Sequence, residues 1–124
     1  MARGAGDGRL REMSFKRSSC AIACALDVIG DKWTLLIVRD LFLGRSRYGE
    51  FLESGEGIPT NVLADRLRRL ETAGLVERTV DPRPRSRHAY RLTPRGRRLG
   101  PVLAALRDWS RREIPGTRVA HGLK

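Results

Sequence analysis

The stretch Ile58-Pro-Thr-Asn-Val-Leu-Ala-Asp-Arg-Leu-Arg-Arg-Leu-Glu71 decides the fold. Three of its leucines recur at steps of four and three: Leu63, Leu67 and Leu70. This spacing places them on one face of a helix, with polar residues on the opposite face. Pro59 favours the start of a helix and Gly74 its end. We therefore expect a helix over residues 59–73 with one buried and one exposed face.

A shorter helix is expected upstream of this one. Ser46 is in position to cap a helix around residues 47–53, and Ser54-Gly-Glu-Gly57 indicates a turn after it. The apolar side chains expected to be buried are Tyr48, Phe51 and Leu52. A short helix, a glycine turn and a second helix with a polar outer face form the helix-turn-helix arrangement. Alone, this pattern has little specificity, because many helical bundles contain it.

The segment after Gly74 predicts a β-hairpin. Residues 75–80 and 88–92 have strand character, and the polar tip between them, 81–87, contains two prolines. A basic hairpin that follows a helix-turn-helix, with its tip over residues 81–88, is a wing. We therefore expect a mainly α fold with a small β-hairpin (α+β), the winged helix-turn-helix.

Positive charge is concentrated near this hairpin. The 124 residues include 25 Lys+Arg and 14 Asp+Glu, a formal net charge of +11, which favours a polyanionic partner such as nucleic acid. Residues 82–99 contain seven arginines and no acidic residue, whereas residues 56–81 contain four arginines and five acidic residues. Codon bias in a GC-rich genome also explains an excess of arginine over lysine. It does not explain the absence of acidic residues from 82–99.

Apolar helices are expected at both ends of the winged domain, with a core helix over Lys32–Leu43 capped by Asp31. Residues 18–29, capped by Ser18 or Ser19, are apolar on all sides, and a last helix runs from Thr93-Pro94 to about residue 113. A small core is already filled by Leu36, Ile37, Phe51, Leu63, Leu67 and Leu70. We therefore assign the remaining apolar side chains to contact with a second copy of the chain. The expected dimerisation residues are Ile22, Leu26, Ile29, Leu99, Val102, Leu103, Leu106 and Trp109.

Five motifs follow one another along about residues 20–109. They are Cys20 with Ala25-Leu-Asp-Val-Ile-Gly-Asp-Lys-Trp33, Arg47-Tyr-Gly-Glu-Phe-Leu52, the stretch 58–71, Gly74-Leu-Val-Glu-Arg78 and Tyr90-Arg-Leu-Thr-Pro-Arg-Gly96. In order and spacing they resemble HxlR-type bacterial transcriptional regulators. The resemblance implies a homodimeric winged helix-turn-helix regulator on an inverted-repeat operator, with the first and last helices at the dimer interface. Cys20 matches an N-terminal cysteine that senses oxidants or electrophiles in some members, although Ala21 replaces the proline that commonly follows it.

These features predict how the chain binds double-stranded DNA. Helix 59–73 enters the major groove, where five residues are candidates to read bases: Thr60, Asn61, Ala64, Asp65 and Arg68. Asp65 is also interpreted as an ion-pair partner of Arg68 three residues on, and each of these residues fits an ordinary solvated face as well. Five arginines are expected on phosphates or in the minor groove: Arg47, Arg69, Arg83, Arg85 and Arg87.

Signals for other chemistry are few. Cys20 is a candidate redox residue because Lys16 and Arg17 precede it, whereas Cys24 is expected in the core. A cavity near Trp33 and Trp109 is a candidate place for a small-molecule effector, although both tryptophans also fit a plain core. The histidines lack neighbours at metal-ligand spacing, and no catalytic triad, phosphate loop or dinucleotide motif is present. We expect no metal, no cofactor and no enzymatic activity.

Two other functions fit a basic chain of this size. One is an RNA-binding or ribosome-associated protein without sequence preference, and the other is a protein-interaction module. RNA readers usually expose aromatic side chains for stacking, whereas most of the seven aromatic residues here fall on expected core faces. The expected divisions are a basic arm over 1–17, the winged domain over 18–113 and a tail over 114–124. No apolar stretch is long enough to span a membrane and no secretion signal is apparent, so we expect a cytoplasmic protein.

Overall fold

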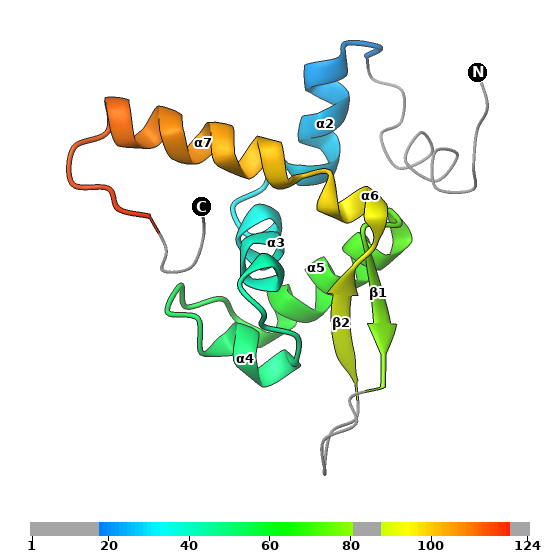
Figure 1. Ribbon diagram of the computed structural model, residues 1–124. Helices are drawn as coiled ribbons and strands as arrows, with labels where there is room; N and C mark the ends of the chain where they lie inside the picture. The colour runs from blue at the N-terminus through cyan, green and yellow to red at the C-terminus, as the bar shows by residue number, and fades with distance from the viewer. Residues whose placement is uncertain (1–17, 81–87, 120–124) are drawn as a thin grey trace.

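The computed structural model describes residues 18–80 and 88–119 (Figure 1). Along the chain the elements are α2 (Ala21–Ile29), α3 (Thr34–Phe42), α4 (Tyr48–Leu52), α5 (Thr60–Thr72), β1 (Val76–Thr79), β2 (Ala89–Leu92), α6 (Pro94–Arg97) and α7 (Gly100–Glu113). The fold is mainly helical with one two-stranded hairpin, as predicted. The predicted basic arm 1–17, the hairpin tip 81–87 and residues 120–124 of the predicted tail lie outside the described residues.

The first described helix, α2, begins later than its sequence suggests. Neither Ser18 nor Ser19 caps it; the cap position is Cys20, and Ser18 Oγ instead accepts a hydrogen bond from the Cys20 backbone N–H at 3.0 Å. The helix ends at Ile29, the predicted last residue, and Gly30 is its C-cap. No residue of α2 is fully buried; Val28, near its end, packs against the core, while its first turns project from the body of the molecule (Figure 1). The described part of the chain therefore leaves the apolar surface around Ile22 and Leu26 uncovered.

Asp31 caps α3, as predicted. Its Oδ2 accepts hydrogen bonds from the backbone N–H groups of Trp33 at 3.0 Å and Thr34 at 3.2 Å, and the Thr34 hydroxyl donates to Oδ1. Because these bonds hold residues 31–33 in a turn, the regular helix starts at Thr34 rather than at Lys32. A left-handed glycine at Gly44 follows the end of α3, with φ of 96°.

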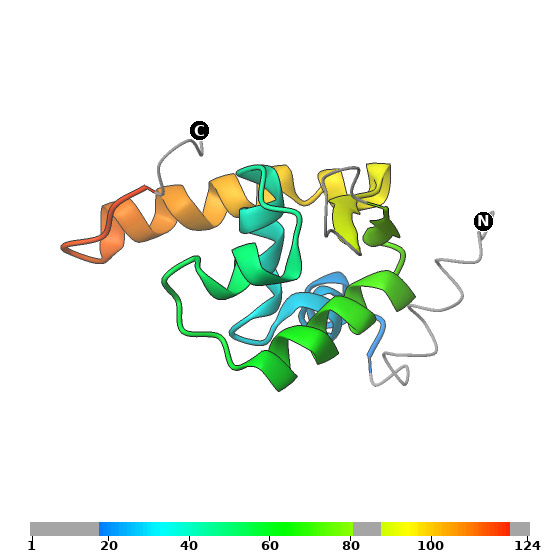
Figure 2. The ribbon, with the colours of Figure 1, turned by 90° about the horizontal axis from the view of Figure 1, so that it is seen from below.

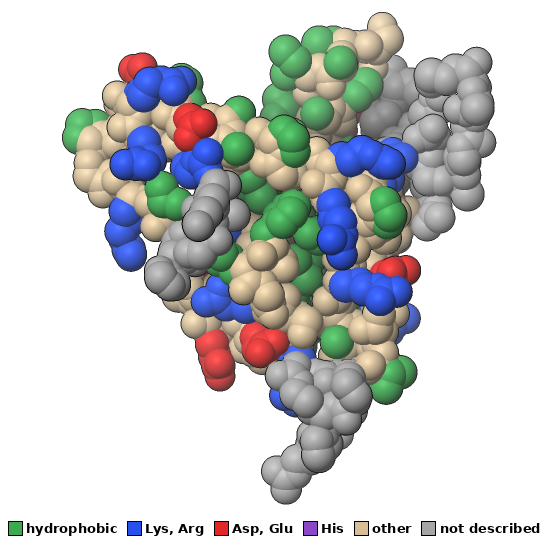
Figure 3. Space-filling model, in the orientation of Figure 1, with side chains coloured by type: hydrophobic (Ala, Val, Ile, Leu, Met, Phe, Trp, Pro, Cys, Tyr) green, Lys and Arg blue, Asp and Glu red, His purple; other side chains and the backbone are tan. Residues whose placement is uncertain are grey.

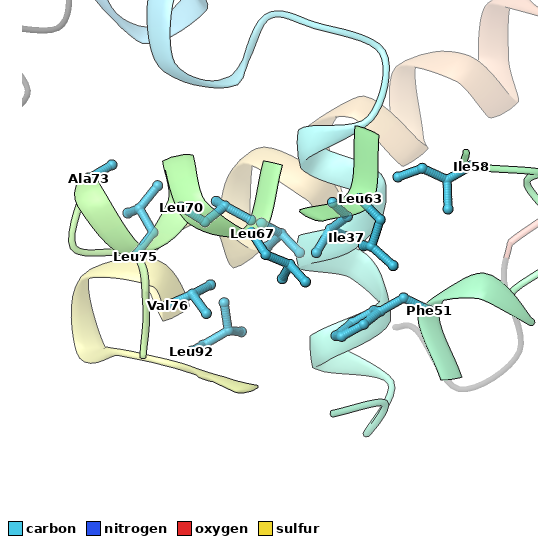
Figure 4. Close-up of a cluster of buried hydrophobic side chains, with 11 residues drawn as sticks. Ile37, Phe51, Ile58, Leu63, Leu67, Leu70, Ala73, Leu75, Val76 and Leu92 are labelled. Atoms are coloured by element: carbon cyan, nitrogen blue, oxygen red, sulfur yellow. The ribbon is translucent and has the colours of Figure 1, made fainter. Parts of the chain in front are cut away.

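The core gathers where α3, α4, α5 and the hairpin meet (Figure 4). Of the predicted core residues, Ile37, Phe51, Leu63, Leu67 and Leu70 are buried. Leu36 is only half-buried, as are Tyr48 and Leu52, which corrects that part of the prediction. Side chains that the prediction did not include complete the core: Val38, Ile58, Ala73, Leu75, Val76 and Leu92. Since three of the five buried predicted residues belong to α5, the core fixes that helix most firmly.

The hairpin pairs β1 with β2 in antiparallel register, with Val76 opposite Leu92 and Glu77 opposite Arg91. A further pairing extends it, because the Tyr90 N–H donates to Ser46 O at 2.7 Å and Arg47 forms an isolated bridge with Ala89. The hairpin is thereby tied to the residues just before α4.

The last helix is divided, whereas the sequence predicted one continuous helix from residue 94 to about 113. Thr93 caps α6 as expected, with its Oγ1 accepting from the Gly96 N–H at 3.1 Å. The break follows from Pro101 in the first turn of α7, because proline lacks an N–H and its ring would clash with the carbonyl four residues earlier in a continuous helix. Past α7, Thr117 Oγ1 donates to Ser110 O at 3.2 Å. Within the described residues, no helix is long and apolar enough to cross a membrane.

Candidate nucleic-acid interface

Two polar contacts hold α5 in addition to its buried leucines. At its start, the Tyr48 hydroxyl donates to Thr60 O at 2.7 Å, which joins α4 to the first turn of α5. In its middle, Arg66 Nε donates to Asp31 Oδ2 at 2.8 Å, which joins α5 to the residues that cap α3. Seen from below, α5 lies at the surface of the molecule, with α3 between it and α7 (Figure 2). These contacts fix both the position of α5 and the face that it presents.

The charge of Asp31 is stabilised at this junction. Burial alone would raise the pKa of its carboxyl group, but hydrogen bonds from Thr34, Arg66 and the Trp33 backbone outweigh burial and lower the pKa from 3.8 to about 2. The Arg66–Asp31 contact is therefore a persistent ion pair at neutral pH.

The outer face of α5 carries the predicted base-reading residues. Thr60 and Asn61 are exposed in the first turn, and Arg68 is 69% exposed farther along. The side chain of Asp65 is surrounded by arginines: its carboxylate lies 3.1 Å from Arg69 and 3.6 Å from Arg68. The predicted pairing of Asp65 with Arg68 is thus confirmed. Ala64 is half-buried on the same helix.

The strands of the hairpin are less cationic than their arginine content suggests. Arg91 pairs with Glu77 across the strands at 2.6 Å, and Arg78 pairs with Glu71 of α5 at 3.0 Å. The predicted phosphate-contacting Arg69 is 60% exposed, whereas Arg47 is half-buried and bridges Ala89 at the start of β2. The other three candidates lie outside the described residues: Arg83, Arg85 and Arg87. Other basic side chains lie along the hairpin and α6 (Figure 3).

The predicted dimerisation residues fall into two groups. Five are exposed: Ile22 (72%), Leu26 (56%), Val102, Leu106 and Trp109 (54%). Three are half-buried: Ile29, Leu99 and Leu103. Leu99 and Leu103 pack against the core of their own chain. Hydrophobic side chains gather on α2, at the end of the molecule opposite the hairpin (Figure 3).

The two cysteines differ in their surroundings. Cys20 is exposed at the cap position of α2. Cys24 is half-buried and outside the core cluster, contrary to the prediction, and its thiol donates to Ser18 O at 3.3 Å. Among the described residues, no group of three or more His, Cys, Asp or Glu side chains is arranged to hold a metal ion.

Sequence reasoning missed the two polar contacts of α5. Tyr48 was assigned to the core as an aromatic residue, although a buried phenol usually needs a partner for its hydroxyl. Arg66 was not singled out, because one arginine among many on α5 has no distinguishing local pattern. The Asp31 cap was the available signal, since a capping carboxylate retains capacity for further hydrogen bonds.

Comparisons with known proteins agree with this geometry. The family model described as HxlR-like helix-turn-helix matches residues 28–117. The chain is 41% identical over 98 residues to the HTH-type transcriptional regulator sll1512 of Synechocystis sp., covering 76% of this chain and 73% of that protein. It is 36% identical over 104 residues to the HTH-type regulator Rv3095 of Mycobacterium tuberculosis, covering 84% of this chain and 65% of that one.

Solved structures show the same fold. PA1607, described as a transcription factor, superposes with a TM-score of 0.76 at 43% identity, over 86% of this chain and 75% of that chain. The redox regulator HypR in its reduced form superposes with a TM-score of 0.68 at 31% identity, over 76% of this chain and 93% of that chain. The reduced transcriptional regulator YodB of Bacillus subtilis superposes with a TM-score of 0.66 at 29% identity, over 82% of this chain and 100% of that chain.

Proposed function

Because the chain belongs to the HxlR-like helix-turn-helix family of transcriptional regulators, we propose that it binds an inverted-repeat DNA operator as a homodimer. The family confirms the resemblance and the winged helix-turn-helix fold, and its members are regulators rather than enzymes. The observation that carries the proposal is the outer face of α5, which is polar, exposed and held by contacts at Thr60 and Arg66.

In this proposal α5 enters the major groove with its first turn toward the bases. Asn61 bonds an adenine edge through two atoms, and Thr60 offers a hydroxyl and a methyl group to thymine. Asp65 serves to organise arginines, because its carboxylate already contacts Arg68 and Arg69. Arg68 then reaches a guanine edge or a phosphate. This arrangement explains why a nearly neutral helix reads sequence within a strongly basic chain.

The arginines around α5 supply affinity without sequence preference. Arg47, Arg69 and the three arginines of the hairpin tip contact phosphates or the minor groove, because arginine suits both sites. Their contribution weakens with salt, since each neutralised phosphate releases counterions.

The dimer is proposed to form through α2 and α7. Ile22 and Leu26 on α2 and Trp109 on α7 expose more than half of their surface, and isolated monomers seldom leave such an apolar helix uncovered. These helices lie above α4 and the strands β1 and β2 in Figure 1, so in this proposal a partner bound there leaves α5 open to DNA.

We also propose that Cys20 makes DNA binding responsive to oxidants. One structural neighbour, HypR, is named as a redox regulator, and another, YodB, was solved after treatment with diamide. In this chain Cys20 is exposed at the cap position of α2, the proposed dimerisation helix. Diamide should release the operator from the native chain and from Cys24→Ser, but not from Cys20→Ser. Release that persists in Cys20→Ser would rule out this sensor.

The central test compares DNA binding to the region upstream of the gene with binding to random DNA. Asn61→Ala should lower the operator-to-random affinity ratio about fivefold to a hundredfold, because one good base contact contributes about 1–3 kcal/mol of discrimination. Arg85→Ala is the matched variant. It should weaken binding to operator and random DNA equally, and it should make the affinity less dependent on salt. Equal losses on both DNAs from Asn61→Ala would contradict base reading by α5. Competition by unrelated RNA as effective as operator DNA would favour the RNA-binding alternative.

A further inference from the structure

A groove of about 980 Å³ lies between α7 and the α3–α4 region. In the ribbon view α3 lies between α7 and α5 (Figure 2). It is lined by side chains of α3, α4 and α7 and by residues 117–119 after α7. Neither Trp33 nor Trp109 lines it, so it is not the cavity that the sequence suggested near those two residues. Its volume is in the range of pockets that hold small organic molecules.

The floor of the groove is apolar and half-exposed. Leu35 and Leu36 come from α3, and Leu103 and Leu106 from α7. Leu36 was expected in the core, but it is only half-buried because one side of it lines this open groove. An apolar body placed on these leucines would remove them from water.

The rim of the groove is cationic. Five arginines line it, Arg39, Arg45, Arg107, Arg111 and Arg118, against two acids, Glu50 and Glu56. Both acids are engaged, because Glu50 Oε1 accepts from the Ser46 and Arg47 N–H groups and Glu56 pairs with Arg39 at 2.9 Å. With five arginines against two acids, the groove keeps an excess of positive charge.

The arginines differ in their availability to a ligand. Arg39 and Arg45 both contact the buried carboxylate of Asp40, at 2.9 and 3.3 Å, and Arg107 pairs with Asp108 at 2.9 Å. Within residues 18–80 and 88–119, Arg111 and Arg118 have no carboxylate within ion-pair distance. These two guanidinium groups, on α7 and just after it, are the ones that an anion in the groove would meet.

We propose that this groove binds an amphipathic organic carboxylate. Its apolar body covers the leucine floor, and its carboxylate accepts hydrogen bonds from Arg111 and Arg118, since guanidinium groups match carboxylates in shape and charge. A small inorganic anion leaves the leucines exposed, and a neutral apolar molecule leaves both arginines without a charge partner. Only a molecule with both parts satisfies the whole groove.

Binding at this place joins α7 to α3. A bound carboxylate fixes the angle between the last helix and the winged domain, and α3 in turn contacts α5 through Asp31 and Arg66. An effect on DNA binding rests on the proposed function, because it requires α7 to position a second subunit. Binding of the carboxylate itself does not, so the two proposals fail separately.

Isothermal titration calorimetry of the full chain with 2-naphthoate and octanoate tests the site, with 2-naphthylmethanol, 1-octanol and acetate as comparisons. Saturable binding of one carboxylate per chain is expected for at least one of the two amphipathic acids. The matched alcohols and acetate should bind at least tenfold more weakly.

Variants locate the ligand. Arg111→Gln and Arg118→Gln should each weaken carboxylate binding about tenfold to a hundredfold, the loss expected for a charge-assisted hydrogen bond. Arg112→Gln is the matched control, because Arg112 is exposed on the same helix and does not line the groove. The proposal is overturned if neither acid binds saturably, if the alcohols or acetate bind as tightly, or if all three variants behave alike. Circular dichroism of each variant checks that the fold is retained.

Discussion

Replacing Asp31 with asparagine should cost about 2 kcal/mol of folding free energy at neutral pH. The carboxylate of Asp31 accepts hydrogen bonds from the Trp33 and Thr34 backbone N–H groups and from Arg66 Nε. Asparagine keeps an oxygen that can cap α3 but has no charge to pair with Arg66. The variant therefore isolates the electrostatic part of the junction between α3 and α5.

The magnitude follows from the pKa of Asp31. Burial opposes ionisation, but the hydrogen bonds lower the pKa from 3.8 to about 2, and at about 1.4 kcal/mol per pKa unit this gives about 2.5 kcal/mol. Because the side chain is 26% exposed, screening by solvent reduces the figure to about 2 kcal/mol. Because the pKa in the folded state lies below that in the unfolded state, this stabilisation is fully present above about pH 4. It is lost as the pH falls toward 2, since the unfolded chain takes up the proton first.

Urea unfolding followed by circular dichroism at several pH values between 7 and 2.5 measures this effect. The free energy of unfolding of the native chain should exceed that of Asp31→Asn by about 2 kcal/mol at pH 7. This difference should shrink steadily below pH 4. Arg66→Gln and the double variant complete a double-mutant cycle. The sum of the losses in unfolding free energy in the two single variants should exceed the loss in the double variant. A difference that stays constant down to pH 2.5, or additive losses in the cycle, would refute this reasoning.

Three further predictions concern packing, the start of α5 and the dimer. Gly96→Ala should lower the free energy of unfolding by about 1–3 kcal/mol in thermal unfolding, because the added Cβ would lie 2.1 Å from a backbone carbonyl oxygen. Gly49→Ala is the control and should cause no loss, because a Cβ there would have no neighbouring atom within 4 Å; similar values for both variants would contradict this account. Tyr48→Phe removes the hydrogen bond to Thr60 O and should cost about 1 kcal/mol in urea unfolding and weaken operator binding in fluorescence anisotropy; unchanged affinity would show that this bond does not orient α5. Leu26→Glu should convert dimers to folded monomers in sedimentation velocity, since its side chain is 56% exposed within one chain, and a persistent dimer would exclude α2 from the interface.

The sequence predicted elements whose pattern is local. The leucine spacing of α5, the Asp31 cap and the Thr93 cap all depend on residues within four positions of one another, and the structure confirms each. The division of the last helix was also signalled, by Pro101, and was missed because the apolar spacing continues across it.

Contacts between distant residues could not be predicted in this way. The Arg66–Asp31 and Tyr48–Thr60 bonds depend on how α3, α4 and α5 pack, and several arginines of α5 were equally plausible partners. The same limit applies to the candidate base-reading residues. Helical spacing places Thr60, Asn61 and Arg68 on the outer face, but their readout of particular bases depends on the path of the DNA.

The last helix shows most clearly what packing adds to pattern. Apolar residues at steps of three and four along α7 predicted one seam, and the structure buries one edge of that seam and exposes the other. Leu99 and Leu103 pack against the core of their own chain, whereas Val102 and Trp109 are exposed. A broad apolar seam can hold its own domain along one edge and a partner along the other edge. The proposed carboxylate site uses Leu103 and Leu106 of this same seam, so a ligand bound there would lie beside the surface proposed for the partner and would alter how α7 meets it.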